Sequence, residues 1–492
     1  MATETLKSKT AKGVFWSSAS NLLSQVVNML FGLVLARILA PEDYGIVGLL
    51  TVFTGLATAL QECGLSSALI NKKDASQKDY DTVFWFTAGS SVVLYVILFF
   101  CTPLIADFYR IPELKPLGRV VFLGFVFSSF CIVPIVKLQK DLHIKKFSLL
   151  ILLVTILSGL CGVVMALCGL AYWGLALQSV GIFFFRMVFV WAAVRWKPTF
   201  SFDLHSFISM WRYGVKILIN RIVDTISNNV LIIFLGRYYS HAQVGYYNQA
   251  SKWSYMAYSV FCGVVTGMMQ PVFVQASDTE ERLQRVFRKT FRFMAMISFA
   301  CMFGLALIAS EFITVAITDK WAPAVPLMRI LCVGGAFIPL TWMCNTLLLS
   351  RGKSNLVMWV AIAASCLQLL MVFLCHPFGI QRMTMAYVGV LLLTFLFIQY
   401  MVGRELKVNY FVLLTDSLFF CTIAAISMLV TGWIAGHIEN IYGRLAGKIL
   451  LAVMVYVFLL RMTGARIYLE MKDYLLQMIR AKFHRKDRGK EC

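Results

Sequence analysis

Apolar stretches of about 20 residues, separated by short polar or basic loops, recur along almost the whole of this 492-residue chain. A helix of that length crosses the hydrocarbon core of a bilayer, which is roughly 30 Å thick. Hydrophobic residues make up 60% of the chain and charged residues only 14%, against about 25% in soluble domains. The sequence therefore predicts an all-α polytopic membrane protein.

The hydropathy pattern predicts about 14 transmembrane helices. No small-residue cleavage site follows the first stretch, so we interpret it as a retained span and not as a signal peptide. The external loops are short, and none is long enough to hold a soluble catalytic domain. The predicted spans are 14–38, 45–70, 82–106, 117–137, 147–168, 172–194, 213–236, 245–271, 290–310, 325–349, 355–375, 383–403, 411–435 and 442–462.

Lys and Arg residues gather in alternate loops along the predicted topology. They include Lys7, Lys9 and Lys12 before the first span and a basic tail from Arg461 to Lys490. Because such loops are retained in the cytoplasm, both termini are predicted to be cytoplasmic. The net charge of +21 then reflects orientation and contact with anionic membrane lipids. It does not indicate a nucleic-acid partner.

The two halves of the chain share a weak repeat at an offset of 200 residues. Residues 36–48 read ARILAPEDYGIVG and residues 235–248 read LGRYYSHAQVGYYN, so Gly45 aligns with Gly245. An even number of helices separates them, which predicts two parallel-repeat bundles around a central cavity. Chance similarity between apolar helices is the alternative. The predicted parts are an N-terminal bundle (1–200), a C-terminal bundle (201–403), two additional helices (404–465) and a basic amphipathic cytoplasmic tail (466–492).

The seventh predicted span carries a polar stripe. Lys216, Asn220, Asp224 and Asn228 recur every four residues, and Arg221 lies beside them. Residues four apart share one face of a helix. A charge at mid-membrane costs about 2.5–3.5 kcal/mol even on lenient scales, so this face is expected to line a hydrated interior.

The first predicted span carries a milder stripe of Asn21, Gln25 and Asn28. At the offset of 200, Asn21 aligns with Arg221 and Asn28 with Asn228. We therefore expect the two stripes to face each other across the central cavity.

Cations outnumber carboxylates in the predicted bundle, which favours an anionic substrate such as a phosphate. Asn248 and Lys252 of the eighth span join the predicted substrate-binding residues, whereas Asp224 and Glu62 are candidates for coupling to a proton or sodium ion. Simpler interpretations remain open: Glu62 pairs with a neighbouring cation, Asp224 serves cations of its own helix, or Lys252 snorkels near a span end. The cations counted in the predicted bundle are Arg186, Lys216, Arg221, Lys252 and Arg329, and the carboxylates are Glu62 and Asp224.

No nucleotide-binding loop, metalloprotease motif or zinc-type cysteine spacing occurs in the sequence. We therefore predict no catalytic residue, no metal and no cofactor. Transport is then driven by an ion gradient or by consumption of the product, and not by ATP hydrolysis in this chain.

Three segments are amphipathic and are expected to lie on the membrane surface, with partner binding as the alternative. The first covers residues 202–212. In the second, one face of a basic segment before the ninth span carries Leu283, Val286, Phe287 and Phe291. The third covers residues 466–482 of the tail.

The segment GVFWSSASNLLSQVVNMLFGLVLARILAPEDYGIVGLL and the later LGRYYSHAQVGYYNQASKW resemble the bacterial polysaccharide transporter family. These are the Wzx-type O-antigen and capsule flippases of the multidrug/oligosaccharidyl-lipid/polysaccharide exporter superfamily. The resemblance covers residues 8–465. It implies alternating access, translocation of polyprenyl-pyrophosphate-linked oligosaccharides for lipopolysaccharide, capsule or exopolysaccharide synthesis, and cooperation with a glycan polymerase. The cationic cavity common in the family fits Arg37, Lys216 and Arg221.

Other functions remain as alternatives. A cation-coupled multidrug exporter of the same superfamily needs an acidic cavity, and a peptidoglycan-precursor flippase differs only in its substrate. A membrane glycosyltransferase, polymerase or ligase needs large external loops with acid and base residues, which the sequence lacks. The charged stripe disfavours a pure scaffold.

Overall fold

The computed structural model of the chain describes residues 6–62, 64–72, 74–140, 144–194, 196–265, 269–464 and 467–470. The regular elements among these residues are helices, without strands. They form two compact units, which are described separately below. The first unit comprises Met1–Gln249, Ile317–Pro323 and Ala361–Tyr387, and the second comprises Ala250–Ala316, Ala324–Val360 and Val388–Cys492.

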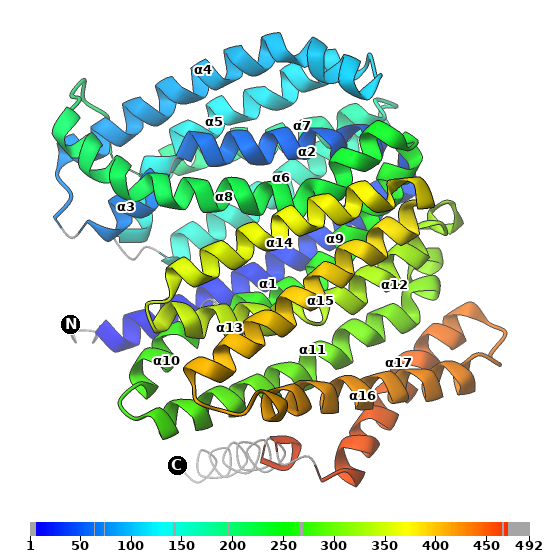
Figure 1. Cartoon of the computed structure of the whole chain (residues 1–492). Helices are drawn as coiled ribbons and strands as arrows, with labels where there is room; N and C mark the ends of the chain where they lie inside the picture. Colours follow the sequence, from blue (N-terminus) through cyan, green and yellow to red (C-terminus); the bar gives the residue numbers. More distant parts are fainter. Residues whose placement is uncertain are drawn as a thin grey trace, which may run out of the picture. The chain divides into compact units, whose positions relative to one another are not determined.

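Eight helices lie wholly within the first unit (Figure 1). Three more helices, α9 (His241–Val264), α14 (Ser354–Cys375) and α15 (Ile380–Glu405), run from one unit into the other. The eight are α1 (Leu6–Ile38), α2 (Pro41–Glu62), α3 (Leu65–Asn71), α4 (Gln77–Tyr109), α5 (Leu114–Lys140), α6 (Ile144–Leu167), α7 (Tyr172–Ala193) and α8 (Leu204–Tyr238).

The second unit holds six further α-helices. The short 3₁₀ turns η2 (Asp319–Trp321) and η3 (His376–Phe378) belong to the first unit. The six are α10 (Gln270–Ala276), α11 (Glu280–Ala316), α12 (Ala324–Gly335), α13 (Ile338–Ser350), α16 (Tyr410–Ala435) and α17 (Ile441–Met462).

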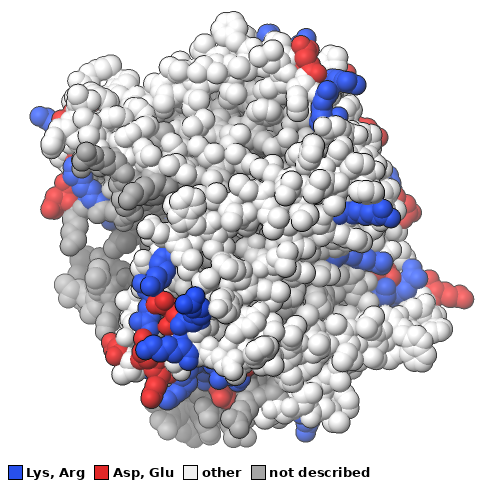
Figure 2. Space-filling model, viewed as in Figure 1, with Lys and Arg blue, Asp and Glu red and all other residues white. Residues whose placement is uncertain are grey.

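Eleven helical segments among the described residues are long and apolar enough to cross a membrane. On the face shown in Figure 2, charged side chains lie mainly near the margins and the wide area between them is largely free of charge. The all-α, multi-pass membrane architecture predicted from hydropathy is therefore confirmed. The α1, α8 and α9 helices fall outside the eleven, and all three carry polar candidate residues. The count of 14 spans stays a prediction.

Two predicted spans, the second and the tenth, are each divided into two helices. The second predicted span is divided into α2 and α3 at Gly64, which has a left-handed backbone (φ 65°) that only glycine adopts without strain. The tenth is divided into α12 and α13, and Pro339 lies at the start of α13, where a residue without an N–H is tolerated. Hydropathy alone does not reveal such breaks, because both sides are apolar.

The α2 helix is central to the first unit, where it packs against α4, α5, α7 and α8. A Cβ added to Gly55 of α2 would lie 2.8 Å from Thr225 Cγ2 of α8. Glycine at this position therefore lets the two backbones approach closely. The α2–α8 pair carries the polar residues described in the next section.

The first turns of α2 and α9 make a reciprocal backbone contact. A Cβ added to Gly45 would collide with the carbonyl oxygen of His241, and a Cβ added to Gly245 would collide with that of Pro41. At the offset of 200 residues, Gly45 corresponds to Gly245 and Pro41 corresponds to His241. Each contact is therefore the repeat equivalent of the other. The predicted repeat is thus matched at this point by a local two-fold arrangement of backbone atoms.

The connection between α7 and α8 is held against the start of α4. The Asp81 carboxylate is fully buried and accepts hydrogen bonds from Gln77 Nε2 (3.0 Å), Thr199 N (3.2 Å) and Ser201 Oγ (3.1 Å). Asp203 then caps α8, and the hydrogen bond from the Ser206 hydroxyl lowers the pKa of this carboxyl. These bonds fix where α8 begins and hence the register of its polar face.

In the second unit, ion pairs attach α11 to α16 and to α17. Glu311 of α11 is 3% exposed, and its Oε1 lies 2.6 Å from Lys448 Nζ and 3.1 Å from Arg444 Nε. Towards the other end of α11, Arg288 and Arg292 pair with Asp416 of α16. Removing one partner of a buried pair leaves an uncompensated charge, so these pairs specify the docking of α16 and α17.

The structure corrects one expectation about the amphipathic segments. The basic segment before the ninth span is continuous with α11, and Leu283, Phe287 and Phe291 are buried in the protein and not on the membrane surface. Phe287 packs against Phe273 of α10 at 5.8 Å between ring centroids. Residues 202–212 lie at the start of α8. Most of the predicted tail lies outside the described residues.

We predict that Gly45→Val destabilises the protein by about 1–3 kcal/mol or more, because the new side chain must displace the His241 backbone. Thermal unfolding of the purified protein in detergent measures this loss. The matched control is Gly89→Ala in α4, where an added Cβ would meet no atom within 4 Å; it should be neutral or slightly stabilising. Equal unfolding temperatures for Gly45→Val and wild type would contradict the close contact.

Candidate functional site

A cavity of about 510 Å³ lies within the first unit and is formed by α2, α5, α7 and α8. Its walls combine apolar groups with hydroxyl, amide and charged groups. The residues that line it are Val47, Leu50, Thr51, Thr54, Gly55, Thr58, Ala59, Val121, Phe125, Ser179, Phe183, Arg221, Asp224, Thr225, Asn228 and Asn229.

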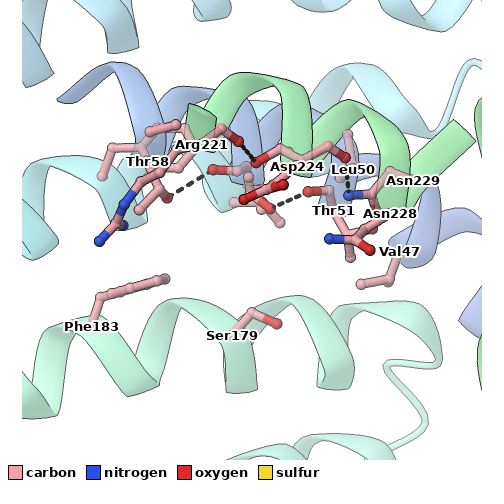
Figure 3. Close-up of a pocket in the computed structure, with 16 residues that line it drawn as sticks. Val47, Leu50, Thr51, Thr58, Ser179, Phe183, Arg221, Asp224, Asn228 and Asn229 are labelled. Atoms are coloured by element: carbon pink, nitrogen blue, oxygen red, sulfur yellow. Dashed lines mark hydrogen bonds between the residues drawn. The ribbon is translucent and has the colours of Figure 1, made fainter. Parts of the chain in front are cut away.

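The α8 wall of this cavity contains three residues of the polar set predicted from the sequence. Arg221, Asp224 and Asn228 lie along the helix and line the cavity (Figure 3). Lys216 and Asn220 occupy the same helix face by their spacing, but their side chains lie outside what the structure describes. The described residues of the stripe therefore lie together on one wall of the cavity.

The α2 wall carries a threonine ladder that we define as Thr51, Thr54 and Thr58. Each hydroxyl donates a hydrogen bond to a carbonyl oxygen of its own helix, at 2.6, 2.9 and 2.8 Å respectively. The hydroxyl oxygens keep free lone pairs and can accept hydrogen bonds from a ligand. Sequence reasoning missed the ladder, although spacings of three and four residues place all three on one helix face.

Arg221 forms an ion pair across the α2–α8 interface. Its Nη1 donates to Glu62 Oε2 at 2.8 Å, and the two side chains are 46% and 25% exposed. Glu62 therefore has a cation partner, as its simpler interpretation expects, and its part in ion coupling stays a prediction. In this structure the guanidinium has a carboxylate partner and a face towards the cavity.

Asp224 is the second carboxylate beside this guanidinium, and it lines the cavity. No hydrogen bond or ion pair joins its carboxylate to another described residue. Together with Glu62 it gives two carboxylates against the single cation Arg221 among the side chains described here. Lys216 precedes Arg221 by five residues in α8, and its side chain lies outside the described part.

The α7 wall faces α8 across the cavity. Figure 3 shows the side chains of Ser179 and Phe183 extending from α7 into the space between the helices. The guanidinium carbon of Arg186 lies 6.0 Å from the centre of the Phe183 ring. An aromatic surface opposite hydroxyl and amide groups suits a ligand with both apolar ring faces and hydroxyls.

The α1 residues predicted to face α8 do not line this cavity. Gln25 is half-buried and Asn28 is exposed, whereas the side chain of Asn21 lies outside the described part. The α1 helix packs instead against α6, and Ser20 Oγ donates to the Ser148 carbonyl oxygen at 2.8 Å. The two polar stripes are thus not joined in one described cavity.

The remaining predicted residues lie at other places. Arg37 is exposed in the last turn of α1. Asn248 of α9 packs on Gly48 and donates to the Tyr44 carbonyl oxygen at 3.2 Å, so its amide serves the α2–α9 contact. Lys252 belongs to the second unit, with its Nζ 5.7 Å from the Trp253 ring centre. None of the three is among the residues that line the cavity.

The chemistry available at the cavity is that of binding. One paired guanidinium, one carboxylate, amides and acceptor hydroxyls can hold a polar ligand. Among the described residues, no group of three or more His, Cys, Asp or Glu side chains could hold a metal ion.

Comparison with known proteins relates the chain to glycan biosynthesis. It is 25% identical over 352 residues to the teichuronic acid biosynthesis protein TuaB of Bacillus subtilis, covering 70% of this chain and 72% of that protein. It is 24% identical over 362 residues to the lipopolysaccharide biosynthesis protein WzxC of Escherichia coli, covering 71% and 72% of the two chains.

The fold is shared with a solved flippase. The structure of the lipid II flippase MurJ in an inward closed conformation superimposes with a TM-score of 0.75 at 15% identity, covering 92% of this chain and 99% of MurJ. The family model described as "Polysaccharide biosynthesis protein" matches residues 34–326, which is more than half of the chain. This multi-pass membrane protein therefore belongs to the polysaccharide biosynthesis protein family.

Proposed function

We propose that the protein is a flippase that translocates polyprenyl-pyrophosphate-linked oligosaccharides across the bacterial inner membrane by alternating access. The main support is a polar cavity with an arginine on α8, in a chain whose family and curated relatives serve glycan biosynthesis. The MurJ fold supports transport of a lipid-linked sugar in particular. On this proposal both termini are cytoplasmic, and the protein is not an enzyme.

The cavity residues suggest how such a substrate is held. The pyrophosphate binds to Arg221, with Lys216 as a second point charge, because a guanidinium donates two parallel hydrogen bonds to phosphate oxygens. The threonine ladder and Asn228 accept and donate hydrogen bonds to sugar hydroxyls, and Phe183 offers an apolar ring face. Arg37, Asn21, Gln25, Asn28, Asn248 and Lys252 stay candidate contacts of this substrate in other states of the transporter.

Glu62 has a specific part in this proposal. It neutralises Arg221 when the site is empty (2.8 Å), so the incoming pyrophosphate must compete with the carboxylate for the guanidinium. Protonation of Glu62 or Asp224 would favour that exchange by removing negative charge next to the phosphate. These two carboxylates are therefore the groups through which a proton or a cation could be coupled to transport.

The released lipid-linked repeat units require a downstream polymerase or ligase, since a flippase makes no bond. We propose a glycan polymerase as the functional partner.

The division of the chain into bundles 1–200 and 201–403, helices 404–465 and tail 466–492 also stays part of this proposal. It follows the repeat, whereas the two compact units follow packing.

A cation-coupled multidrug exporter is the second candidate. The observation that favours it is that Arg221 is accompanied by two described carboxylates, Glu62 at 2.8 Å and Asp224 in the cavity wall. A cationic drug binds such a site through Asp224. Export of a cationic dye that is lost in Asp224→Asn, while glycan export is kept, would support this candidate over the flippase.

We predict that Arg221→Ala lowers glycan export by roughly 10- to 100-fold, because hydrogen bonds to a charged group contribute about 1.5–3 kcal/mol. Accumulation of lipid-linked repeat units on the cytoplasmic face measures this, with the amount of protein in the membrane as the reference. Arg382→Ala, which removes an exposed arginine at the start of α15, is the control and should export normally. Normal export by Arg221→Ala would remove Arg221 from the proposed site.

We predict that Glu62→Gln strengthens binding of a short-chain isoprenyl pyrophosphate by roughly two- to fivefold, because the competing carboxylate charge is lost from a half-exposed pair. Titration of the purified protein, followed by intrinsic fluorescence, measures the dissociation constant. The double variant Arg221→Ala, Glu62→Gln should lose this gain. Unchanged or weaker binding by Glu62→Gln alone would contradict the competition.

A further inference from the structure

The second unit contains a cluster in which two guanidiniums share one carboxylate. Asp416 of α16 is 7% exposed, and its oxygens lie 3.0 Å from Arg288 Nε and 2.5 Å from Arg292 Nη2. Arg288 Nη2 lies 3.4 Å from the second oxygen. Two cations against one anion leave a net charge of +1 on the cluster, which favours an additional anionic ligand.

A hollow of about 320 Å³ adjoins this cluster, between α11, α16 and the end of α17. Arg292 and Asp416 form its polar end, whereas aromatic and aliphatic side chains form its other wall. The Lys289–Glu470 ion pair (2.5 Å) connects α11 to residues 467–470, the segment that supplies Ile467. The residues that line the hollow are Arg292, Thr415, Asp416, Phe419, Phe420, Thr463, Gly464 and Ile467.

The hydrogen-bond donors that face the hollow come from arginine. The Thr415 hydroxyl donates to the Val412 carbonyl oxygen at 2.9 Å, and the Thr463 hydroxyl donates to that of Leu459 at 2.8 Å. Arg292 uses Nη2 for Asp416, and its Nε and Nη1 donate to no other residue in the described part. A guanidinium with unused N–H groups at the end of an apolar hollow is suited to a phosphate oxygen.

The depth of the cluster fits the headgroup region. It lies in the first third of α11, a stretch that also carries Arg282, Arg285 and Lys289. Loops rich in such residues define the side predicted to be cytoplasmic, where anionic lipid headgroups concentrate. Phe419 is 38% exposed, so one aromatic wall of the hollow is also accessible to lipid.

We propose that this hollow binds the phosphodiester headgroup of an anionic phospholipid, with Arg292 donating to the phosphate and Phe419 contacting the upper part of an acyl chain. Arg288 keeps Asp416 paired while Arg292 serves the lipid. The site lies in a different unit from the α2–α8 cavity and does not depend on the proposed transport activity. The bound lipid would stabilise the docking of α16 and α17 on α11.

Native mass spectrometry of the detergent-purified full chain with added phosphatidylglycerol tests the proposal. The wild type should retain the lipid, and Arg292→Gln should retain roughly tenfold less, because charge-assisted hydrogen bonds are lost. The matched control is Arg282→Gln on the same helix, whose arginine is 60% exposed and pairs with Asp278 (3.0 Å). This control should retain lipid as the wild type does. Equal retention by Arg292→Gln and wild type would overturn the proposal.

Three further arms decide the source of the phosphate and guard against misfolding. Phosphatidylcholine should be retained less than phosphatidylglycerol, and millimolar inorganic phosphate should not displace the lipid. Displacement by inorganic phosphate, together with normal retention in Phe419→Ala, would indicate a free-phosphate site and reject the lipid. Should Arg292→Gln unfold at a lower temperature without lipid, Arg292→Lys and Phe419→Ala replace it, and full retention in both contradicts the proposal.

Discussion

The cost of a charge in hydrocarbon is the constraint on which the rest of the structure depends. An isolated ion at mid-membrane is disfavoured by about 2.5–3.5 kcal/mol even on lenient scales, so charged side chains on spans pair with one another or face water. The described charges follow both routes: Arg221 pairs with Glu62 beside a cavity, and Glu311 pairs with Lys448 inside the second unit. Each pair also specifies which helix packs on which, because a different neighbour would leave both ions unpaired.

Close backbone approach is the second determinant, and it depends on residues with no side chain. Gly45 and Gly245 allow the starts of α2 and α9 to meet through backbone atoms, and Gly55 lets α2 approach α8 beside the cavity. In a bilayer such contacts replace the hydrophobic effect, since lipid tails are as apolar as the helix surfaces. The repeat in the sequence and the two-fold contact in the structure therefore have one cause, because the same small residue is needed twice for the same approach.

The sequence predicts the positions of the helices because hydropathy is a local property. The predicted spans coincide with helices or with helix pairs, whereas the breaks at Gly64 and before Pro339 lie inside apolar stretches that have no hydropathy signal. The polar face of α8 was also predictable, because its four-residue spacing is local. The Glu62–Arg221 pair joins residues 159 apart in the sequence. Which cation pairs with Glu62 depends on how the helices pack, and packing cannot be read from local sequence patterns. The threonine ladder was missed for a different reason. Threonine is tolerated in apolar spans, so its presence there does not indicate a polar site.

On the proposed function, the pairing of Arg221 with Glu62 also accounts for how an anion-binding site can release its substrate. A bare guanidinium facing a pyrophosphate would bind it through several charge-assisted hydrogen bonds and release it slowly. A transporter site must bind its substrate tightly enough to take it up and weakly enough to release it, as in ion channels. In the proposed site Glu62 is the competitor, at 2.8 Å from the guanidinium in this structure, so the free energy of binding would be the difference between two ion pairs and not the whole of one. The carboxylates that argue against a purely cationic cavity are therefore the groups that would make an anion-binding cavity reversible.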